Sequence, residues 1–408
     1  MPPEFTPAEP AWLADPYPFY AQLRQEDPVH WAAAPEGRWV LTRYADVTAA
    51  LRDPRLVKAG AKPLLADVPA AVLPELAPLQ QTVEQQIDSI NPPLHTRLRR
   101  LVNAGFTPEL VAARRGQVQQ VIDGLLDTLV PRGQMDLIQD FTAPLPATII
   151  MEVFGVPPDA RDHIKQWSDD YAALMGHGPV DADPAAVARR AQASTLAFTE
   201  YLRGVVADHR QHPRGDLLDA LITAEDQGDA LTADELLANL RVLLIAGNET
   251  TTNLIGNGLL ALFRQPDQLA RLRADPSLIP TAVEELLRYD SPVQMVFRWA
   301  GEAFTLGGKA VQQGQMVVMV TGAANRDPAQ FPQPDRLDVA RQPNEHHAFG
   351  FGIHYCVGAL LARLEAQLAF PALFRRLANV ELAGEPVRKP NPVLRGLQSL
   401  PLKFTAAS

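Results

Sequence analysis

Residues 349–358 carry the chain's only cysteine in the stretch Phe349-Gly350-Phe351-Gly352-Ile353-His354-Tyr355-Cys356-Val357-Gly358. The three glycines predict a tight turn with positive φ angles and a backbone that comes close to something large and flat. The apolar periodicity that follows predicts a helix from Gly358 to about Leu377, with a kink at Pro371. The free amides and positive dipole end of such a helix favour the thiolate form of a nearby cysteine.

A lone cysteine is more often a small buried apolar side chain than a functional group. Here the glycine-rich turn, the helix N-terminus and His354, two residues before the thiol, supply an environment that stabilises negative charge. We therefore expect Cys356 to serve as a metal ligand or as a nucleophile.

The length of 408 residues exceeds the roughly 250–300 at which one hydrophobic core usually stops growing. No Gly/Ser-rich linker or block of like charges divides the chain, however, and 47% of its residues are apolar. We therefore expect a single domain over residues 1–408, with no fused reductase.

The cysteine count, the N-terminal sequence and the net charge indicate the compartment of the protein and the classes of partner that it is not expected to bind. A single cysteine rules out a disulfide framework and fits a reducing compartment. The N-terminus carries no signal-peptide pattern, and no apolar run approaches the roughly 18 residues of a membrane span. A net charge of −10 disfavours nucleic acid. We expect a soluble, cytoplasmic monomer that binds neither membrane nor nucleic acid.

Helical periodicity dominates from about Pro92 to Leu272, while short strand-like segments lie mostly toward the two ends of the chain. The clearest strands are residues 38–42, 317–320 and 402–405. The sequence thus predicts a mainly α protein with a small β part.

The longest predicted helix begins after Thr232, which can form a capping box with Glu235, and ends near Gln265. Its middle, residues 246–252, reads Ala-Gly-Asn-Glu-Thr-Thr-Thr and disfavours a helix locally. Apolar flanks predict that this polar segment is buried. A threonine hydroxyl that bonds back to a carbonyl and kinks the helix would explain it without any function, but failures of local consistency also tend to mark functional sites.

Glu285 and Arg288 stand three residues apart on a predicted helix over residues 279–289. Such a pair usually means only a surface contact of a few tenths of a kcal/mol. The segment after it contains a proline-rich stretch that ends in Arg336.

Taken together, these segments resemble the cytochrome P-450 family. The cysteine stretch matches its haem-binding loop, Phe-x-x-Gly-x-His/Arg-x-Cys-x-Gly, and residues 246–251 match its oxygen-activation motif, Ala-Gly-x-Asp/Glu-Thr-Thr. Glu285 and Arg288 match its Glu-x-x-Arg. The resemblance covers about residues 10–405, with the motifs in the family's order.

The resemblance implies the cytochrome P-450 fold, with haem b between the long distal helix and the helix after the cysteine loop. Cys356 would ligate the iron, and its thiolate would favour O–O cleavage. Glu249 and Thr250 would be the acid and the alcohol that deliver protons. Thr250 would bond toward the Ala246 carbonyl.

The family pattern also implies structural and cofactor-binding roles. Glu285, Arg288 and Arg336 would form a buried ion network behind the cysteine loop. The remaining haem contacts implied by the resemblance, including cations that neutralise the two propionates, are His95, Arg99, Ala246, Arg298, Phe349, Gly350, His354 and Gly358.

The resemblance predicts a monooxygenase that inserts one oxygen atom of O₂ into a lipophilic small molecule. Two electrons would come from a ferredoxin or flavodoxin with its NAD(P)H-dependent reductase, which we expect to dock on a basic patch near the cysteine, formed by Arg97, Arg100 and Arg363. One alternative is a peroxide-driven peroxygenase, against which the Glu249–Thr250 pair argues. The other is a haem-thiolate sensor or electron-transfer protein without a substrate.

Family position also suggests an apolar substrate pocket, of which one wall is the stretch Leu64–Leu79. Ala246 would set the space over the haem, since it lies one helical turn before Thr250. The other expected pocket residues are Leu243, Met295, Val296, Leu397 and Gln398.

Overall fold

The computed structural model describes residues 3–33, 37–177, 183–225 and 230–407. The chain divides into two compact units, each described here by itself. The first unit comprises Met1–Val57, Arg115–Pro146 and Glu249–Ser408, and the second comprises Lys58–Arg114 and Ala147–Asn248. One domain over residues 1–408 stays a prediction.

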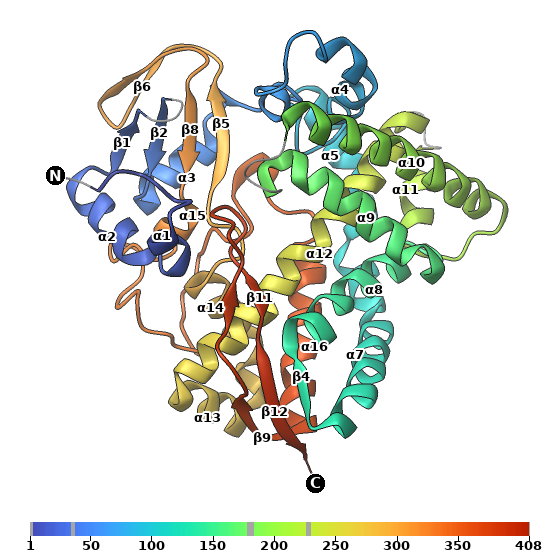
Figure 1. Ribbon diagram of the computed structural model, residues 1–408, viewed down its shortest axis with the longest axis vertical. Helices are drawn as coiled ribbons and strands as arrows, with labels where there is room; N and C mark the ends of the chain where they lie inside the picture. The colour runs from blue at the N-terminus through green and yellow to red at the C-terminus, as the bar shows by residue number, and fades with distance from the viewer. Residues whose placement is uncertain (1–2, 34–36, 178–182, 226–229, 408) are drawn as a thin grey trace. The chain divides into compact units, whose positions relative to one another are not determined.

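The first unit combines helices with all of the strands in the described part of the chain (Figure 1). Its helices are α1 (Pro10–Ala14), α2 (Tyr17–Glu26), α3 (Tyr44–Arg52), α7 (Arg115–Leu129), α13 (Pro266–Ala274), α14 (Ile279–Tyr289), α15 (Thr321–Ala324) and α16 (Ala359–Arg376). A π-helical segment spans Leu137–Thr142. Helices α8 (Pro144–Val153) and α12 (Ala233–Arg264) are continuous across the boundary between the units.

The largest sheet has the strand order β1-β2-β8-β5-β3, with β2 and β8 parallel and the other neighbours antiparallel. Two smaller sheets pair β4-β12-β9 and β10-β11, and β6 pairs with β7. The strands are β1 (Val29–Ala32), β2 (Arg38–Leu41), β3 (Leu56–Val57), β4 (Gln134–Asp136), β5 (Val296–Ala300), β6 (Phe304–Leu306), β7 (Lys309–Val311), β8 (Met316–Met319), β9 (Leu377–Leu382), β10 (Val387–Arg388), β11 (Leu397–Ser399) and β12 (Pro401–Ala406).

Both faces of the large sheet are covered, because neighbouring residues of its central strands belong to different cores. Leu41 and Met319, which are partners in the register, join a cluster with α3. Val40 and Val318, the next pair along, join a cluster with α1 and α2. Side chains alternate between the faces of a strand, so the continuous apolar runs of β2 and β8 are the expected signature of strands buried on both sides.

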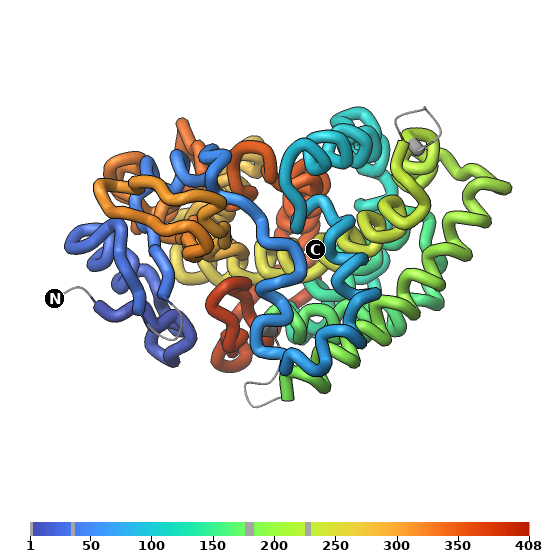
Figure 2. Tube along the Cα trace, turned by 90° about the horizontal axis from the view of Figure 1, so that it is seen from above, coloured from blue at the N-terminus to red at the C-terminus, as the bar shows by residue number. Residues whose placement is uncertain are grey.

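The second unit is helical except for its short connections. It contains α4 (Ala77–Val83), α5 (Leu94–Asn103), α6 (Pro108–Ala113), α9 (Arg161–Ala172), α10 (Pro184–Gln211) and α11 (Leu217–Glu225). Helices α9 and α10 lie side by side in both views (Figures 1 and 2). The apolar stretch from Leu64 to Leu79 packs with Tyr171 and Ala188 of these helices.

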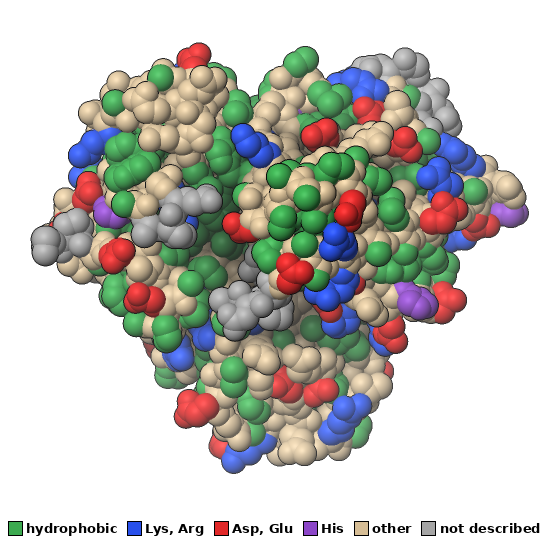
Figure 3. All heavy atoms as spheres, turned by 45° about the horizontal axis from the view of Figure 1, so that its top comes forward, with side chains coloured by type: hydrophobic (Ala, Val, Ile, Leu, Met, Phe, Trp, Pro, Cys, Tyr) green, Lys and Arg blue, Asp and Glu red, His purple; other side chains and the backbone are tan. Residues whose placement is uncertain are grey.

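The predicted secondary structure agrees with the observed elements. The predicted helix over residues 279–289 is α14, and α12 and α16 end within a residue of the predicted positions. The mainly α fold class with a small β part is confirmed. Over the described ranges, no helix has the length and hydropathy needed to cross a bilayer. Positive and negative side chains are interspersed over the face shown in Figure 3.

Candidate functional site

The cysteine loop is held by its own backbone and leaves the thiol exposed. The amide of Cys356 donates to the Phe349 carbonyl at 2.9 Å, and Cys356 itself is exposed. Gly350 and Gly352 have φ angles of 72° and 74°, as the turn requires. A Cβ atom at Gly352 would also lie 2.9 Å from a carbonyl oxygen of α3, so a side chain is excluded there.

Gly358 differs from the other two glycines of the loop. Its φ angle is −81°, so the expectation of positive φ at all three glycines is wrong here. No heavy atom lies within 4 Å of the place where its Cβ atom would be. Gly358 is the N-cap of α16, whose first-turn amides have no side-chain cap. The loop therefore offers an exposed thiol and an open backbone surface beside a helix N-terminus.

A salt bridge between α14 and α16 supports the loop from one side. The Arg363 guanidinium donates to both carboxylate oxygens of Glu284, at 2.7 and 2.8 Å, and to the hydroxyl of Tyr355 at 3.1 Å. It also lies over the ring of Phe349, 4.5 Å from the centroid. Burial raises the pKa of Glu284, but the hydrogen bonds from Arg363 and His346 outweigh it and lower that pKa to about 2.

The long helix α12 begins with the predicted capping box. Thr232 Oγ1 accepts the Glu235 amide at 3.2 Å, and a Glu235 carboxylate oxygen accepts the Thr232 amide at 2.8 Å. Residues 241–244 and 251–260 are buried, whereas 245–250 are half-buried or exposed. The apolar flanks are thus buried as predicted, but burial of the polar segment between them is wrong for residues 246–250. The helix keeps an accessible stretch at Glu249 and Thr250.

Glu249 forms an ion pair that sequence patterns did not indicate. Its Oε1 accepts a hydrogen bond from Lys389 Nζ at 2.9 Å. Lys389 comes from the loop after β10, 140 residues along the chain. Helical and strand repeats relate residues only a few positions apart, so no such pattern could indicate this contact, which depends on the fold.

Glu285 forms a buried ion network, but one of its predicted members is wrong. Arg288 donates to both Glu285 oxygens at 2.7 and 2.9 Å, and neither residue is exposed. The second cation is Arg341, which donates to the same oxygens at 3.0 and 3.1 Å. Arg336 is exposed, and its guanidinium contacts Gln333 at 3.4 Å. Arg336 instead supplies a carbonyl that accepts from both arginines.

The predicted cofactor-binding residues fall in both units. Arg298, on β5, is 6% exposed and lies opposite Val317 in the sheet, and His354 lies in the 3₁₀ turn Gly352–His354 of the cysteine loop. His95 and Arg99, on α5, and Ala246, on α12, belong to the second unit. Their arrangement around a cofactor stays a prediction.

The predicted pocket residues differ in accessibility. Met295 and Leu397 of the first unit and Leu243 of the second are buried, whereas Val296 is half-buried and Gln398 exposed. The backbone oxygen of Gln398 accepts from Gln139 at 2.8 Å. Their contacts with a substrate stay predictions.

Two of the three arginines expected to form a basic docking patch are neutralised by glutamates. Arg363 pairs with Glu284, and Arg97 pairs with Glu235 at 3.0 Å. These ion pairs reduce the net positive charge of the expected patch, and docking of an electron donor on Arg97, Arg100 and Arg363 stays a prediction. Arg100 is exposed.

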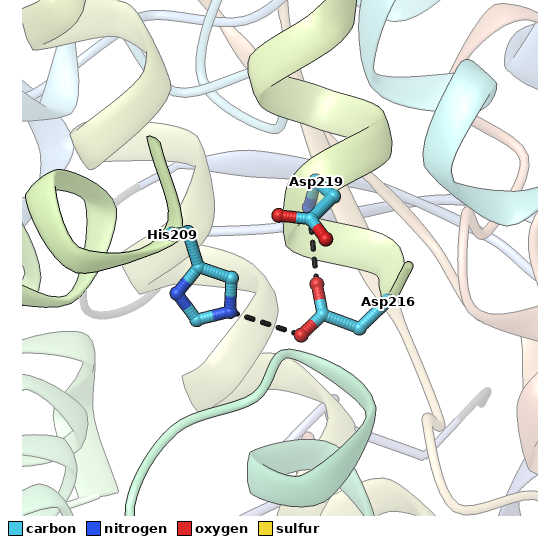
Figure 4. Close-up of side chains that lie close together, drawn as sticks. All are labelled: His209, Asp216 and Asp219. Carbon is cyan, nitrogen blue, oxygen red and sulfur yellow. Dashed lines mark hydrogen bonds and ion pairs between the residues drawn. The ribbon is translucent and has the colours of Figure 1, made fainter. Parts of the chain in front are cut away.

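Figure 4 shows a second cluster of metal-ligand type, His209 of α10 with Asp216 and Asp219 at the start of α11. His209 Nε2 and Asp216 Oδ2 are 2.9 Å apart, while His209 Nδ1 contacts the Val205 carbonyl. Asp216 Oδ1 accepts the amides of Leu218 and Asp219 at 3.0 Å. Through these hydrogen bonds the cluster caps α11 and joins it to α10.

The cysteine loop fits a haem bound through the thiolate. The thiol is the single cysteine of the chain, and it is exposed in a loop whose Gly358 leaves open space beside it. A thiolate can ligate haem iron only where its sulfur is accessible, as the sulfur of Cys356 is.

Comparison with known proteins agrees with this fit. Residues 72–405 match the profile of the family described as Cytochrome P450. The chain is 41% identical to Cytochrome P450 107B1 of Saccharopolyspora erythraea, with 98% of each protein covered. It is 40% identical to Cytochrome P450 monooxygenase PikC of Streptomyces venezuelae, over 96% of this chain and 92% of that protein.

The fold is shared as well. The crystal structure of CalO2 superposes with a TM-score of 0.90 at 32% identity, and 99% of this chain and all of that chain are covered.

Proposed function

The chain belongs to the cytochrome P450 family and is a monooxygenase of lipophilic small molecules, and from this premise we propose that Cys356 is the iron ligand of a bound haem b. The observation that carries the proposal is the exposed thiol in a positive-φ glycine turn at the N-terminus of α16. Bound haem would supply the activation of O₂ and the transfer of one oxygen atom to the substrate.

The chain's own residues would move protons and hold the cofactor. Glu249 would take a proton from water and pass it to the Thr250 hydroxyl, which would give up its own proton in turn. The accessible stretch of α12 at these two residues supports this role. The propionates would be neutralised by His95, Arg99, Arg298 and His354.

The substrate would bind by shape against apolar side chains. Ala246, one turn before Thr250, is exposed on α12 and would set the space beside the haem. An apolar wall discriminates by only about 1–3 kcal/mol per methylene, so we expect several related lipophilic compounds to bind. The other pocket residues proposed are Leu243, Met295, Val296, Leu397 and Gln398.

Electrons would come from a ferredoxin or flavodoxin and its NAD(P)H-dependent reductase. We place the two units in one catalytic domain over residues 1–408, because the family profile spans segments of both. A reducing, cytoplasmic location suits a chain whose single cysteine must stay a thiolate.

Spectroscopy of the reduced protein with CO tests the central assignment. A thiolate-ligated haem gives a strongly red-shifted Soret band, and Cys356→His should replace it by the band of a histidine-ligated haem. A histidine-type spectrum in the folded parent protein would contradict the assignment of Cys356. Dependence of turnover on NADPH and O₂, rather than on added peroxide, separates the monooxygenase from a peroxygenase.

A further inference from the structure

Three polar side chains of α12, Glu249, Asn253 and Asn257, follow one another at intervals of four residues and share one face of the helix. The loop between β10 and β11, residues 389–396, lies against this face. Lys389 bonds to Glu249 at one end, and at the other Asn257 Nδ2 donates to the Arg395 carbonyl at 2.9 Å. Arg388, just before the loop, donates to Asn257 Oδ1 at 2.8 Å.

The middle residue of this face is bonded differently. Asn253 is 1% exposed, and neither its Oδ1 nor its Nδ2 has a hydrogen-bond partner among the described residues. A Cβ atom at Gly396 would lie 1.9 Å from Asn253 Oδ1, so a residue with a side chain is excluded at this position of the loop. Buried amides are almost always satisfied by protein or by ordered water. Among the described residues the amide of Asn253, one turn from Glu249, is thus a buried polar group without a protein partner.

The ion pair at Glu249 leaves part of the carboxylate accessible. Lys389 bonds to Oε1 alone, and the side chains of Lys389 and Glu249 are 28% and 31% exposed. The ammonium thus fixes the direction of the carboxylate without enclosing it. A carboxylate that is held in one direction and is partly accessible to solvent is what a proton path from solvent requires.

We propose that Lys389 is the positioning residue of the proton relay: it holds the Glu249 carboxylate on the Asn253 side of α12, where water can reload it with a proton. The proposal rests on the role proposed above for Glu249 and Thr250. Each turnover consumes two protons, and for every proton that Glu249 gives to Thr250 it takes one from water, so Lys389 gains and loses none.

The test uses Lys389→Met, which keeps the length and removes the charge, and Lys389→Arg, which keeps the charge. Lys403→Met is the matched control, because Lys403 pairs with Glu381 at 2.9 Å in the same C-terminal region, with both side chains at least 60% exposed. Hydrogen peroxide released per NADPH consumed is measured with a surrogate ferredoxin and its reductase, in H₂O and in D₂O. The infrared stretch of CO bound to the reduced protein gives a readout that does not depend on activity.

We expect Lys389→Met to raise peroxide release about threefold or more, to increase the solvent isotope effect and to shift the CO stretch. Lys389→Arg should stay within about twofold of the parent. Added to Glu249→Gln, Lys389→Met should change nothing further, because it acts through the carboxylate that Gln replaces. The proposal would be overturned if Lys389→Met, like Lys403→Met, left peroxide release, the isotope effect and the CO stretch at the parent's values. It would also be overturned if the increases in peroxide release caused by Lys389→Met and Glu249→Gln multiplied in the double variant.

Failure of the relay itself gives a different pattern. If Glu249→Gln leaves peroxide release and the isotope effect unchanged while the thiolate-type CO band is present, the proposed role of Glu249 is overturned, and with it that of Lys389. If Glu249→Gln impairs the relay and Lys389→Met does not, only the positioning role is overturned.

Discussion

Two glutamates of the first unit, Glu285 and Glu249, each pair with cations, but in contrasting surroundings. Glu285 is fully buried and receives hydrogen bonds from two arginines, the Asn344 amide at 3.2 Å and the Asp338 backbone amide at 2.9 Å. Glu249 is about a third exposed and receives one bond, from Lys389. A fully satisfied buried carboxylate holds structure, whereas a partly accessible one can exchange protons with water.

The contrast predicts the largest loss of stability at Glu285. Glu285→Ala leaves Arg288 and Arg341 buried without a counter-charge, which costs about 3–5 kcal/mol. We expect haem-free or insoluble protein, and for any soluble fraction a much lower free energy of unfolding in urea. Glu381→Ala, at an exposed pair, is the control and should lose less than about 1 kcal/mol. Normal haem content in Glu285→Ala would contradict a structural role for the network.

A third glutamate, Glu365 of α16, sharpens the comparison because it is buried without a cation. It is 3% exposed, its Oε2 has no hydrogen-bond partner among the described residues, and burial raises its pKa from 4.5 to about 8. Between these two values the unfolded chain has released the proton that the folded protein keeps. The stability of the parent therefore falls as pH rises through this window, by about 1.4 kcal/mol per pH unit from this group.

Glu365→Gln removes that titration while conserving shape. As the pH rises from 5 to 8, Glu365→Gln should become more stable relative to the parent. Thermal melts of both proteins across this pH range measure the difference in their free energies of unfolding. A difference that stays constant with pH would show that Glu365 ionises normally in the folded protein.

Arg336 was the predicted third member of the Glu285 network, but Arg341 is the arginine that bonds to Glu285. Arg341→Ala removes charged hydrogen bonds to Glu285, each worth about 1.5–3 kcal/mol. Arg336→Ala truncates an exposed guanidinium and keeps the backbone carbonyl that both arginines use. Urea denaturation should show a clear loss for Arg341→Ala and one below about 0.5 kcal/mol for Arg336→Ala. Equal losses would restore Arg336 to the network.

Local pattern predicted what depends on local chemistry. The capping box at Thr232, the extent of α14 and the turn glycines of the cysteine loop follow from residues within a few positions of one another. The strands predicted at residues 38–42, 317–320 and 402–405 likewise correspond to β2, β8 and β12.

The missed features are contacts between residues distant in the sequence. Lys389 reaches Glu249 across 140 positions, and Arg341 rather than Arg336 reaches Glu285 because the intervening segment turns. Asn253 gave no signal, because its environment depends on Gly396 of the distant loop. Residue type and spacing cannot choose between two arginines five positions apart, since the choice depends on the path of the chain.

The last comparison is between two threonines of α12, Thr250 and Thr252, which stand two positions apart. Thr252 is buried and its hydroxyl donates to the Thr142 carbonyl at 2.8 Å, so Thr252→Ala should cost about 1 kcal/mol and leave peroxide release per NADPH unchanged.

Thr250 is half-buried, and alanine is the better helix former by about 0.5 kcal/mol. Thr250→Ala should therefore fold at least as stably as the parent and keep the thiolate-type CO band, but waste NADPH as peroxide or water. The relay alcohol is expected to behave in this way, because a functional residue can be needed for turnover even though it destabilises its own helix. Coupling at the parent's value in Thr250→Ala would remove this residue from the relay and leave it a helix irregularity without a function.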